Sequence, residues 1–184
     1  MIQYKKYYMP GTKEELLKTI DTIDCTYDIL AGGTDLYAKE KTPFNGADAA
    51  IDISGIKEFS VIELKKDEGL ITFGSNICIQ QFLEEKVLME NVPILRHAAI
   101  YFADQQIREM ATVGGNVANS SPSGDTIAPL TVLEAVIHTI TSKDNKICEK
   151  ETPITEFITG VGKNLLEKGE VISSITCPVL KEYG

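Results

Sequence analysis

The chain has 184 residues, of which 43% are hydrophobic and 24% are charged, the composition of an ordinary globular protein with a buried core. Its formal net charge is -9 at pH 7, and its lysines and arginines form no basic run. This pattern argues against nucleic acid as a partner, because phosphate backbones are bound by clustered basic side chains.

The cysteines and histidines of the chain lack the spacing of a metal site. They are Cys25, Cys78, His97, His138, Cys148 and Cys177. No two cysteines lie close enough in sequence for a zinc knuckle or a CxxC pair. We therefore expect four reduced thiols and no zinc or iron–sulfur site within the chain.

Neither end of the sequence nor its interior suggests targeting to a membrane. Residues 1–6 contain no apolar signal core, and no stretch approaches the roughly 20 apolar residues that a membrane span needs. We therefore expect a cytoplasmic protein without a membrane span.

The first predicted element is a helix that begins after Thr12. Thr12 and Glu15 have the spacing of a capping box, and Pro10-Gly11 punctuates the entry. Leu16, Leu17 and Ile20 then recur at the spacing of one apolar helix face.

Two short strands follow that helix. Residues 27–31 form the first, which ends in Gly32-Gly33, and a short helical stretch near residues 36–40 follows the turn. Residues 49–53 form the second strand. Residues 1–54 are therefore predicted to form a small β-α-β lobe.

The second lobe, residues 55–184, is predicted to be mostly antiparallel. Its elements in chain order are a hairpin of residues 60–64 and 70–74 that turns at 66–69, helices at 78–85 and 93–102, a Gly/Ser/Asn-rich stretch at 112–125, a short helix at 127–133, strands at 135–140 and 146–148 joined by a turn at 143–145, and a last strand at 170–175. The fold class is α+β with two lobes.

Two segments each place a pair of glycines at the end of an apolar or small-residue stretch. They are Ala31-Gly32-Gly33-Thr34-Asp35-Leu36 and Ala111-Thr112-Val113-Gly114-Gly115-Asn116. Glycine allows positive φ and lets a ligand approach the main chain. Successive N–H groups in such a turn form an anion-binding nest, and Thr34 and Thr112 add hydroxyl donors. The pair predicts a phosphate site, although two ordinary strand-end turns would show the same pattern.

Better-known phosphate motifs fit the sequence poorly. No G-x-G-x-x-G follows a predicted strand, so a dinucleotide-binding Rossmann unit is not supported. Residues 160–164 resemble the end of a P-loop, but Asn164 replaces serine or threonine and Phe157 stands where the first glycine belongs. We interpret this segment as a loop that carries a lysine by chance.

The two glycine segments resemble a known family. The first, residues 31–36, is similar to the first FAD pyrophosphate loop of molybdenum-hydroxylase flavoprotein subunits, the family of xanthine dehydrogenase and carbon monoxide dehydrogenase. Residues 111–125 look like the second, longer signature of the same family, in the same order and at the same separation. The opening Tyr8-Met9-Pro10 and residues 172–178 also match, so the resemblance covers essentially the whole chain. It implies a two-lobed FAD-binding domain of the PCMH type.

The resemblance also implies which residues contact FAD. The pyrophosphate and ribityl chain would be wrapped by Ile29, Leu30, Ala31, Gly32, Gly33, Thr34, Asp35 and Leu36. The phosphate cradle would be completed by Thr112, Val113, Gly114, Gly115 and Asn116. Phe102 would pack on the cofactor, Asp125 would accept a hydrogen bond from its adenosine end, and Ile172 would touch the flavin ring.

Three of these residues have a structural alternative. Asp125 also suits the N-cap of the helix near Ile127. Phe102 and Ile172 are also ordinary core residues by type. The sequence leaves both interpretations open.

Subunits of this family usually continue past the position of Pro178 into a further domain, and the resemblance implies that this domain is absent from a chain ending at Gly184. The resemblance further implies an oxidoreductase subunit that is active only within a complex. Partner subunits would carry the molybdenum cofactor and [2Fe-2S] clusters, and FAD would pass electrons from those clusters to NAD or another acceptor. The substrate of such a complex stays open.

Two other functions are consistent with the same residues. The chain could be a non-catalytic assembly module of such a complex that has lost its flavin. It could also be a flavoprotein of the wider oxidase fold acting alone on oxygen, although nothing in the sequence resembles a substrate domain.

Overall fold

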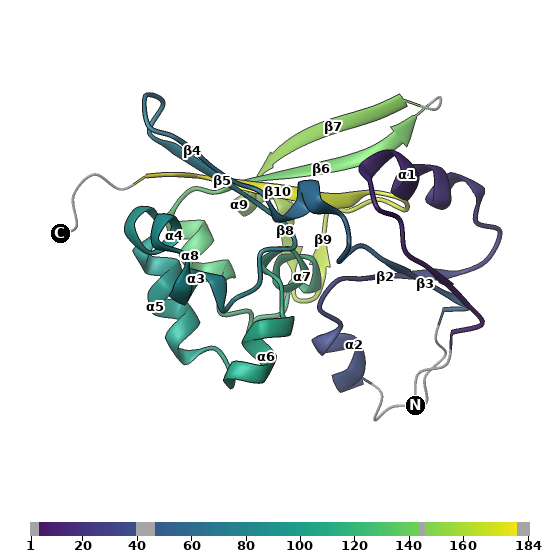
Figure 1. Cartoon of the computed structure of the whole chain (residues 1–184), viewed down its shortest axis with the longest axis horizontal. Coiled ribbons are helices and arrows are strands. Elements are labelled where there is room, and N and C mark those ends of the chain that lie inside the picture. Colours follow the sequence, from purple (N-terminus) through teal and green to yellow (C-terminus); the bar gives the residue numbers. More distant parts are fainter. Residues whose placement is uncertain (1–3, 40–46, 144–145, 180–184) are drawn as a thin grey trace.

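The computed structural model describes residues 4–39, 47–143 and 146–179, which contain a small parallel sheet, a larger antiparallel sheet and a two-stranded hairpin. Figure 1 shows the large sheet across the top of the molecule, a group of helices beneath one half of it, and the small sheet beside the other half. The predicted α+β class, with a parallel first part and an antiparallel second part, is confirmed.

The small sheet has the order β1-β3-β2, and all its pairings are parallel. Its strands are β1 (Lys6–Tyr8), β2 (Tyr27–Leu30) and β3 (Ala49–Asp52), and α2 (Thr34–Lys39) lies between β2 and β3 in the chain. The central strand β3 is apolar and its first three residues are fully buried, as expected for a strand paired on both sides. β1 had not been predicted, since it is only three residues long.

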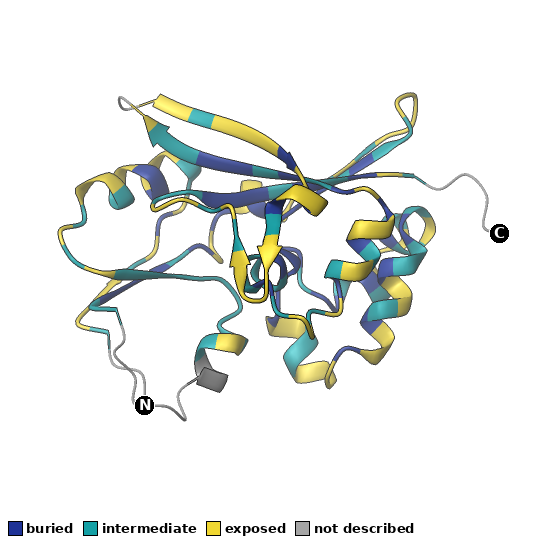
Figure 2. Cartoon of the chain, turned by 180° about the vertical axis from the view of Figure 1, so that it is seen from behind, coloured by how far each residue is buried: buried dark blue, intermediate teal, exposed yellow. Residues whose placement is uncertain are grey.

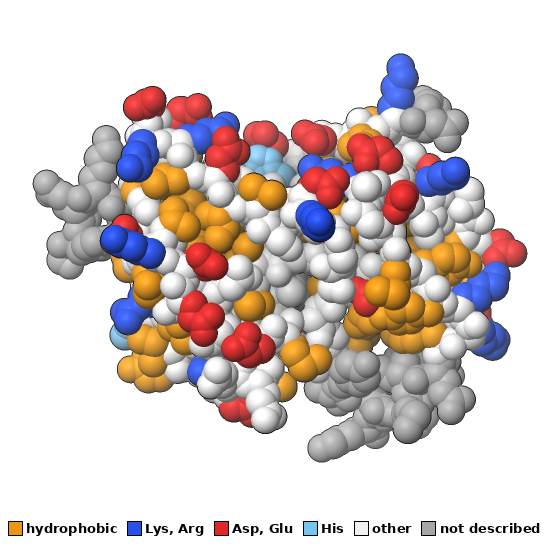
Figure 3. Space-filling model, viewed as in Figure 1, with side chains coloured by type: hydrophobic (Ala, Val, Ile, Leu, Met, Phe, Trp, Pro, Cys, Tyr) orange, Lys and Arg blue, Asp and Glu red, His pale blue; other side chains and the backbone are white. Residues whose placement is uncertain are grey.

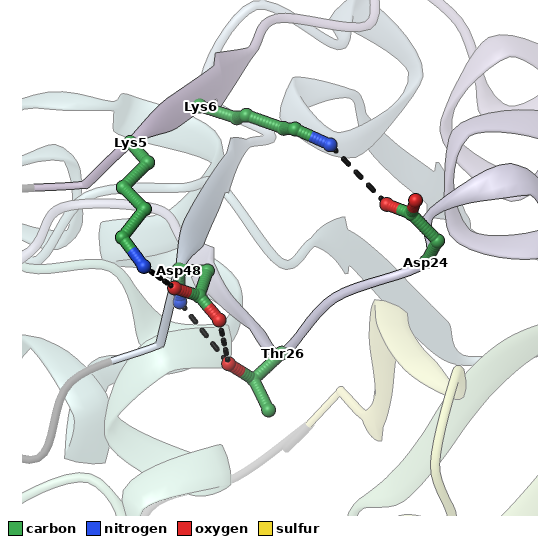
Figure 4. A network of polar contacts seen from close by, with 5 residues as sticks. All are labelled: Lys5, Lys6, Asp24, Thr26 and Asp48. Atoms are coloured by element: carbon green, nitrogen blue, oxygen red, sulfur yellow. Dashed lines mark hydrogen bonds and ion pairs between the residues drawn. The ribbon is translucent and has the colours of Figure 1, made fainter.

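The connection into β3 is fastened by the polar network of Figure 4. Lys5 Nζ lies 2.5 Å from Asp48 Oδ1, and Thr26 Oγ1 donates to Asp48 Oδ2 at 3.2 Å. The hydrogen bond from Lys5 lowers the pKa of the Asp48 carboxyl. Because Lys5 and Asp48 are solvent-exposed, the main contribution of the network is to orient the strand ends rather than to stabilise the fold.

The first helix, α1 (Lys13–Thr22), confirms the predicted capping box with one difference. Thr12 Oγ1 accepts from Glu15 N at 3.2 Å. The Glu15 carboxylate reaches one residue further back than expected and accepts from Gly11 N at 2.7 Å. Leu16 and Leu17 are buried, so the predicted apolar face does lie against the core.

The large sheet has the order β4-β5-β10-β6-β7 and is antiparallel throughout. Its strands are β4 (Ile62–Lys65), β5 (Leu70–Gly74), β6 (Val136–Lys143), β7 (Lys146–Pro153) and β10 (Val171–Pro178). The last strand in the chain is therefore the central one. β7 lies at an edge and is mostly exposed, as the yellow outer strand in Figure 2 shows. Its lysines and glutamates discourage pairing with another chain.

Most of the helices gather on one side of the large sheet (Figure 1). They are α3 (Gln81–Glu84), α4 (Lys86–Asn91), α5 (Pro93–Tyr101), α6 (Gln105–Met110), α7 (Val113–Asn119) and α8 (Ile127–Val132). The rings of Phe73 in β5 and Phe82 in α3 meet edge to face at 5.4 Å, and they join the sheet to the helices in one apolar cluster.

Short elements complete the chain. A 3-10 turn, η1 (Lys57–Ser60), precedes β4, and α9 (Ile154–Phe157) leads into a small hairpin of β8 (Ile158–Gly160) and β9 (Lys163–Asn164). The P-loop-like segment at residues 160–164 is the turn of this hairpin, with Gly162 at φ 64. Its Asn164 Nδ2 donates to Ala118 O at 2.7 Å, so the segment supports the end of α7.

A second apolar cluster crosses the boundary predicted at residue 54. It joins Leu16 of α1 and Ile51 of β3 to Phe59, Ile140 and Val171 of the larger part. The two sheets thus share buried contacts, and a division into lobes 1–54 and 55–184 stays a prediction.

Several predicted boundaries were wrong. The stretch predicted as a Gly/Ser/Asn-rich loop at 112–125 contains α7, and the helix predicted from residue 78 begins only at Gln81. Helices α4 and α6 were not predicted. The predicted helix end at Glu40 and the turn residues Asp144 and Asn145 lie outside the described residues.

Within the described ranges, no helix is long and apolar enough to cross a membrane, and no group of three or more His, Cys, Asp or Glu side chains could hold a metal ion. The four cysteines are all free thiols. His138 is structural, with Nε2 2.7 Å from Thr176 Oγ1 on the neighbouring strand.

Cys177 of β10 gives a test of the central strand. It is fully buried, and burial raises the pKa of its thiol from 9.0 to about 12. We expect iodoacetamide at pH 9 to leave Cys177 unmodified in the native protein and to alkylate it in denaturant, because the thiolate is the reactive form. Peptide mass spectrometry measures this, and the half-buried Cys25 is the internal control.

The same shift sets a pH dependence of stability. In the unfolded chain the thiol ionises near pH 9, whereas in the fold it ionises only near pH 12. Its contribution to stability is therefore complete below pH 9 and is lost as pH rises toward 12. In the alkylation experiment at pH 9, equal labelling of Cys177 and Cys25 in the native protein would contradict both the raised pKa of Cys177 and the central position of β10.

Candidate functional site

A cavity of about 600 Å³ opens between the small sheet and the helices, within the usual size of small-molecule sites. Its walls come from the β2–α2 turn, the end of β5, the α5–α6 connection, α7 with the loop after it, and the start of β10. In Figure 1, α7 lies in the middle of the molecule, between the helical half and the small sheet. Segments that are far apart in sequence therefore meet around one space.

The two glycine segments touch through their main chains. A Cβ added at Gly32 would lie 1.7 Å from Met110 O and 2.6 Å from the Met110 carbonyl carbon. Only glycine allows this approach, because any side chain would push the two segments apart. The two pairs of glycines seen in the sequence therefore lie on neighbouring parts of the wall of one cavity.

The β2–α2 turn presents unpaired backbone donors. Gly33 adopts φ 71, in the left-handed region that favours glycine. The N–H groups from Gly32 to Asp35 donate no hydrogen bond to another described residue. Consecutive unpaired N–H groups around a left-handed residue form a concavity that binds anions.

The second glycine pair works differently from the sequence prediction. Gly114 and Gly115 lie in the first turn of α7, not in an open loop. The N–H groups from Val113 to Asn116 are all used within the protein, on Ile77 O, Ser75 O, Thr112 Oγ1 and Thr112 O. A Cβ at Gly114 would lie 2.5 Å from Ser75 Cβ, so this glycine serves the packing of α7 on the end of β5. Of the two glycine segments, only the first therefore keeps N–H groups without a described partner for the expected cradle.

What the second segment offers the cavity is side-chain donors. Asn116 Oδ1 accepts from Thr126 Oγ1 at 2.6 Å, which fixes the orientation of the carboxamide and leaves Nδ2 as a donor. Thr112 Oγ1 accepts from Gly115 N at 3.1 Å, and its hydroxyl proton remains able to donate. Both residues line the cavity.

The structure brings together nearly all of the predicted site residues. Every one of them lines the cavity except Leu30, which lies in β2, and Val113, which is fully buried. The cavity also has walls that were not predicted, formed by Ile53, Ser75, Asn76, Ala103, Ile107, Ala111, Ala118, Asn119, Ser121, Ser123, Gly124, Leu166, Glu170 and Val171. Ser75 and Asn76 follow a predicted strand directly, and that position is the one signal that could have suggested them.

The structure bears on the structural alternatives for Asp125, Phe102 and Ile172. Asp125 is exposed and lines the cavity, while Thr126 is the N-cap residue of α8 and no side chain caps that helix. Phe102 and Ile172 are 9% and 4% exposed and belong to the core cluster, yet both also line the cavity. Each of these two residues therefore belongs both to the hydrophobic core and to the wall of the cavity.

The charge of the wall is negative. Asp35, Asp125 and Glu170 line the cavity, and its lining in the described part of the chain includes no lysine or arginine. The Glu170 carboxylate accepts from Thr139 Oγ1 and, at 2.9 Å, from Glu167 N. On the face shown in Figure 3, acidic and basic side chains are interspersed, and hydrophobic surface flanks a central strip of other atoms. An anionic ligand would therefore depend on backbone and amide donors.

Residues 2–180 of the chain match the protein family described as the FAD binding domain in molybdopterin dehydrogenase. The chain belongs to this family. The family assignment, the FAD cofactor and the two-lobed α+β fold predicted from sequence are thereby confirmed.

Several relatives support the assignment. The chain is 28% identical over 174 residues to the nicotinate dehydrogenase FAD-subunit of Eubacterium barkeri, covering 92% of this chain and 57% of that protein. It is 31% identical over 150 residues to a putative xanthine dehydrogenase FAD-binding subunit of Escherichia coli K12, covering 82% and 50%. The solved carbon monoxide dehydrogenase of Hydrogenophaga pseudoflava, in a form lacking the Mo-pyranopterin moiety, matches with a TM-score of 0.88 at 26% identity, over 98% of this chain and 61% of that chain. The chain thus spans about half the length of the curated relatives it matches.

The residues of this FAD-binding domain fit the cofactor. The Gly32–Asp35 turn offers N–H donors for a pyrophosphate, and apolar wall residues such as Phe102 and Ile172 suit aromatic rings. Ser75 and Asn76 also line the cavity, although Ser75 Oγ and Asn76 Oδ1 themselves are buried and have no hydrogen-bond partner among the described residues.

Proposed function

We propose that the chain is the FAD-binding part of an oxidoreductase subunit in a molybdenum-containing dehydrogenase complex. FAD in such a complex accepts electrons singly from iron–sulfur clusters of a partner subunit and delivers them in pairs to NAD or another acceptor. The observation that carries the proposal is the meeting of both glycine segments of an FAD-binding family around one cavity. The relatives are named as FAD subunits of nicotinate and xanthine dehydrogenases and as a carbon monoxide dehydrogenase medium chain.

The residues of this chain have binding and orienting roles in the proposal. The Gly32–Asp35 turn donates N–H groups to the pyrophosphate, and Thr112 and Asn116 add a hydroxyl and an amide donor. Asp125 accepts a hydrogen bond from the adenosine end, as the family resemblance implies, and its carboxylate is available because it is exposed at the cavity and is not used as a helix cap. The other predicted cavity residues supply the remaining contacts.

The alternative of an assembly module that has lost its flavin is less well supported. A chain that had lost its cofactor would have no use for a turn of consecutive N–H groups that donate to no other described residue. In the proposed function these donors bind the pyrophosphate, whereas an assembly module leaves them without a role.

Reconstitution tests the electron-transfer role. The FAD-loaded chain is mixed anaerobically with the molybdenum and [2Fe-2S] subunits of a dehydrogenase complex and with the substrate of that complex. We expect the flavin absorbance to bleach in the complete mixture and to stay unchanged when the [2Fe-2S] subunit is omitted, because electrons reach FAD through the clusters. NAD added afterwards should restore the absorbance if it is the acceptor. Fast bleaching by NADH with the chain alone, equal to that in the complete mixture, would contradict the subunit role.

A further inference from the structure

The connection between α5 and α6 is short and lies in the wall of the cavity. Phe102 is the C-cap of α5, and Asp104 is already the N-cap of α6, with Oδ1 accepting from Ile107 N at 2.9 Å. Ala103 alone makes the reversal, at φ 37, a left-handed conformation that non-glycine residues rarely adopt. Phe102, Ala103 and Ile107 all line the cavity.

Arg108 of α6 holds this strained turn by hydrogen bonds to the backbone of the turn. Its Nη1 donates to Phe102 O at 3.0 Å and to Ala103 O at 3.2 Å. Its Nε donates to Gln80 Oε1 at 2.9 Å, and Gln80 N donates back to Arg108 O at 3.1 Å. The guanidinium thus donates to uncharged oxygens of the protein, and it connects Gln80, the N-cap of α3, to the turn at Ala103.

The shape of the guanidinium is what makes this arrangement possible. Arginine presents several donors in a rigid planar fork, so one side chain serves Gln80 and two carbonyls at once. Lysine carries a single ammonium on a flexible stem and could keep the charge but not this set of directions. Gln80 is 7% exposed, and its Nε2 donates to Glu84 Oε1 at 2.7 Å, so the fork has a fixed anchor.

We propose that Arg108 is a positioning residue of the FAD site: it holds the left-handed turn at Ala103 and thereby fixes the Phe102 ring against the bound cofactor. The proposal rests on the proposed function only in naming FAD as the molecule that contacts Phe102. The hydrogen bonds from Arg108 to Gln80, Phe102 and Ala103, here called the Arg108 clamp, form in the protein without ligand. The clamp can therefore be tested separately from FAD binding.

The first test needs no cofactor. The chain contains no tryptophan, so Phe102→Trp introduces a single indole at the cavity wall, which is excited at wavelengths that the tyrosines do not absorb. We expect the fluorescence anisotropy of this probe to fall when Arg108→Lys is added, because the turn then loses its fork. Arg96→Lys is the matched control, since Arg96 is the other arginine of the chain and lies exposed on α5. Unchanged anisotropy with Arg108→Lys would overturn the proposal.

The second test is a double-mutant cycle on FAD binding. Arg108→Lys and Phe102→Ala are each expected to raise the FAD dissociation constant about tenfold, and the double variant is expected to be no worse than Phe102→Ala alone, as for residues that act as a unit. Losses that multiply independently would show that Arg108 does not act through Phe102. If the unmodified chain does not bind FAD, the proposed function fails, while the anisotropy test still decides the role of Arg108.

A gentler variant covers the case in which Arg108→Lys does not fold. Thermal melting of each variant shows this directly. Gln80→Leu leaves the arginine in place and removes the acceptor that anchors its Nε. We expect it to lower the anisotropy of the Phe102→Trp probe in the same direction, and a folded Gln80→Leu protein with unchanged anisotropy would also contradict the proposal.

Discussion

Replacing Gly33 by valine is expected to weaken FAD binding by more than about 100-fold, roughly 3 kcal/mol. Gly33 stands at φ 71 in the turn whose N–H groups have no described partner, and a β-branched side chain there would fill the approach to those groups. The measurement is a titration of the purified protein with FAD, followed by flavin fluorescence.

The matched control for this change is Gly69→Val. Gly69 has φ 66, lies in the turn between β4 and β5, and has nothing within 4 Å of an added Cβ. Both variants carry the backbone strain of a left-handed valine, about 1–2 kcal/mol, but only one of them faces the cavity. Equal FAD affinity in the two variants would remove the Gly32–Asp35 turn from the pyrophosphate site.

Gly32→Ala is expected to have the second large effect, on both stability and binding. An alanine Cβ would lie 1.7 Å from Met110 O and 3.1 Å from Ala111 Cα, and the obstacle is backbone, which cannot rotate away. The two glycine segments must then separate, which we expect to lower the free energy of unfolding by about 1–3 kcal/mol, as other overpacking changes do. The expected loss of FAD affinity exceeds tenfold, because the donors of the two segments no longer face one space.

Gly55→Ala controls for the general cost of the substitution. The nearest atom to an added Cβ there is Pro10 O at 4.0 Å, an ordinary contact. Denaturant unfolding and FAD titration of the two variants separate the local clash from the change in chain entropy. A Gly32→Ala protein as stable and as tight-binding as Gly55→Ala would show that the two segments do not meet in solution.

The negative wall of the cavity gives the FAD site its physical character. A dianionic pyrophosphate would be bound beside Asp35 without a lysine or arginine in the described lining, so the binding energy must come from oriented dipoles. Such dipoles bind well only when the protein holds them rigidly before the ligand arrives. The Gly32 contact with Met110 and the Arg108 clamp at Ala103 are both devices of that kind.

Much of the architecture followed from short-range signals in the sequence. Thr12 and Glu15 placed the first helix, because a capping box is a contact between near neighbours. The alternation in residues 60–74 placed the β4–β5 hairpin for the same reason. The glycine pairs and the residues around them identified the family, and through it the cofactor.

What the sequence by itself determined is therefore the family, the FAD cofactor and the turn at Gly33, each encoded in a few consecutive residues, and the α+β class, encoded in the order of the elements along the chain. Only the tertiary structure decided the conformation of Gly114 and Gly115. Two adjacent glycines disfavour a helix by about 1 kcal/mol each, and α7 forms because glycine lets it pack on Ser75. The central place of β10 and the clamp by Arg108 likewise depend on segments distant in sequence, whose contacts local propensity does not encode.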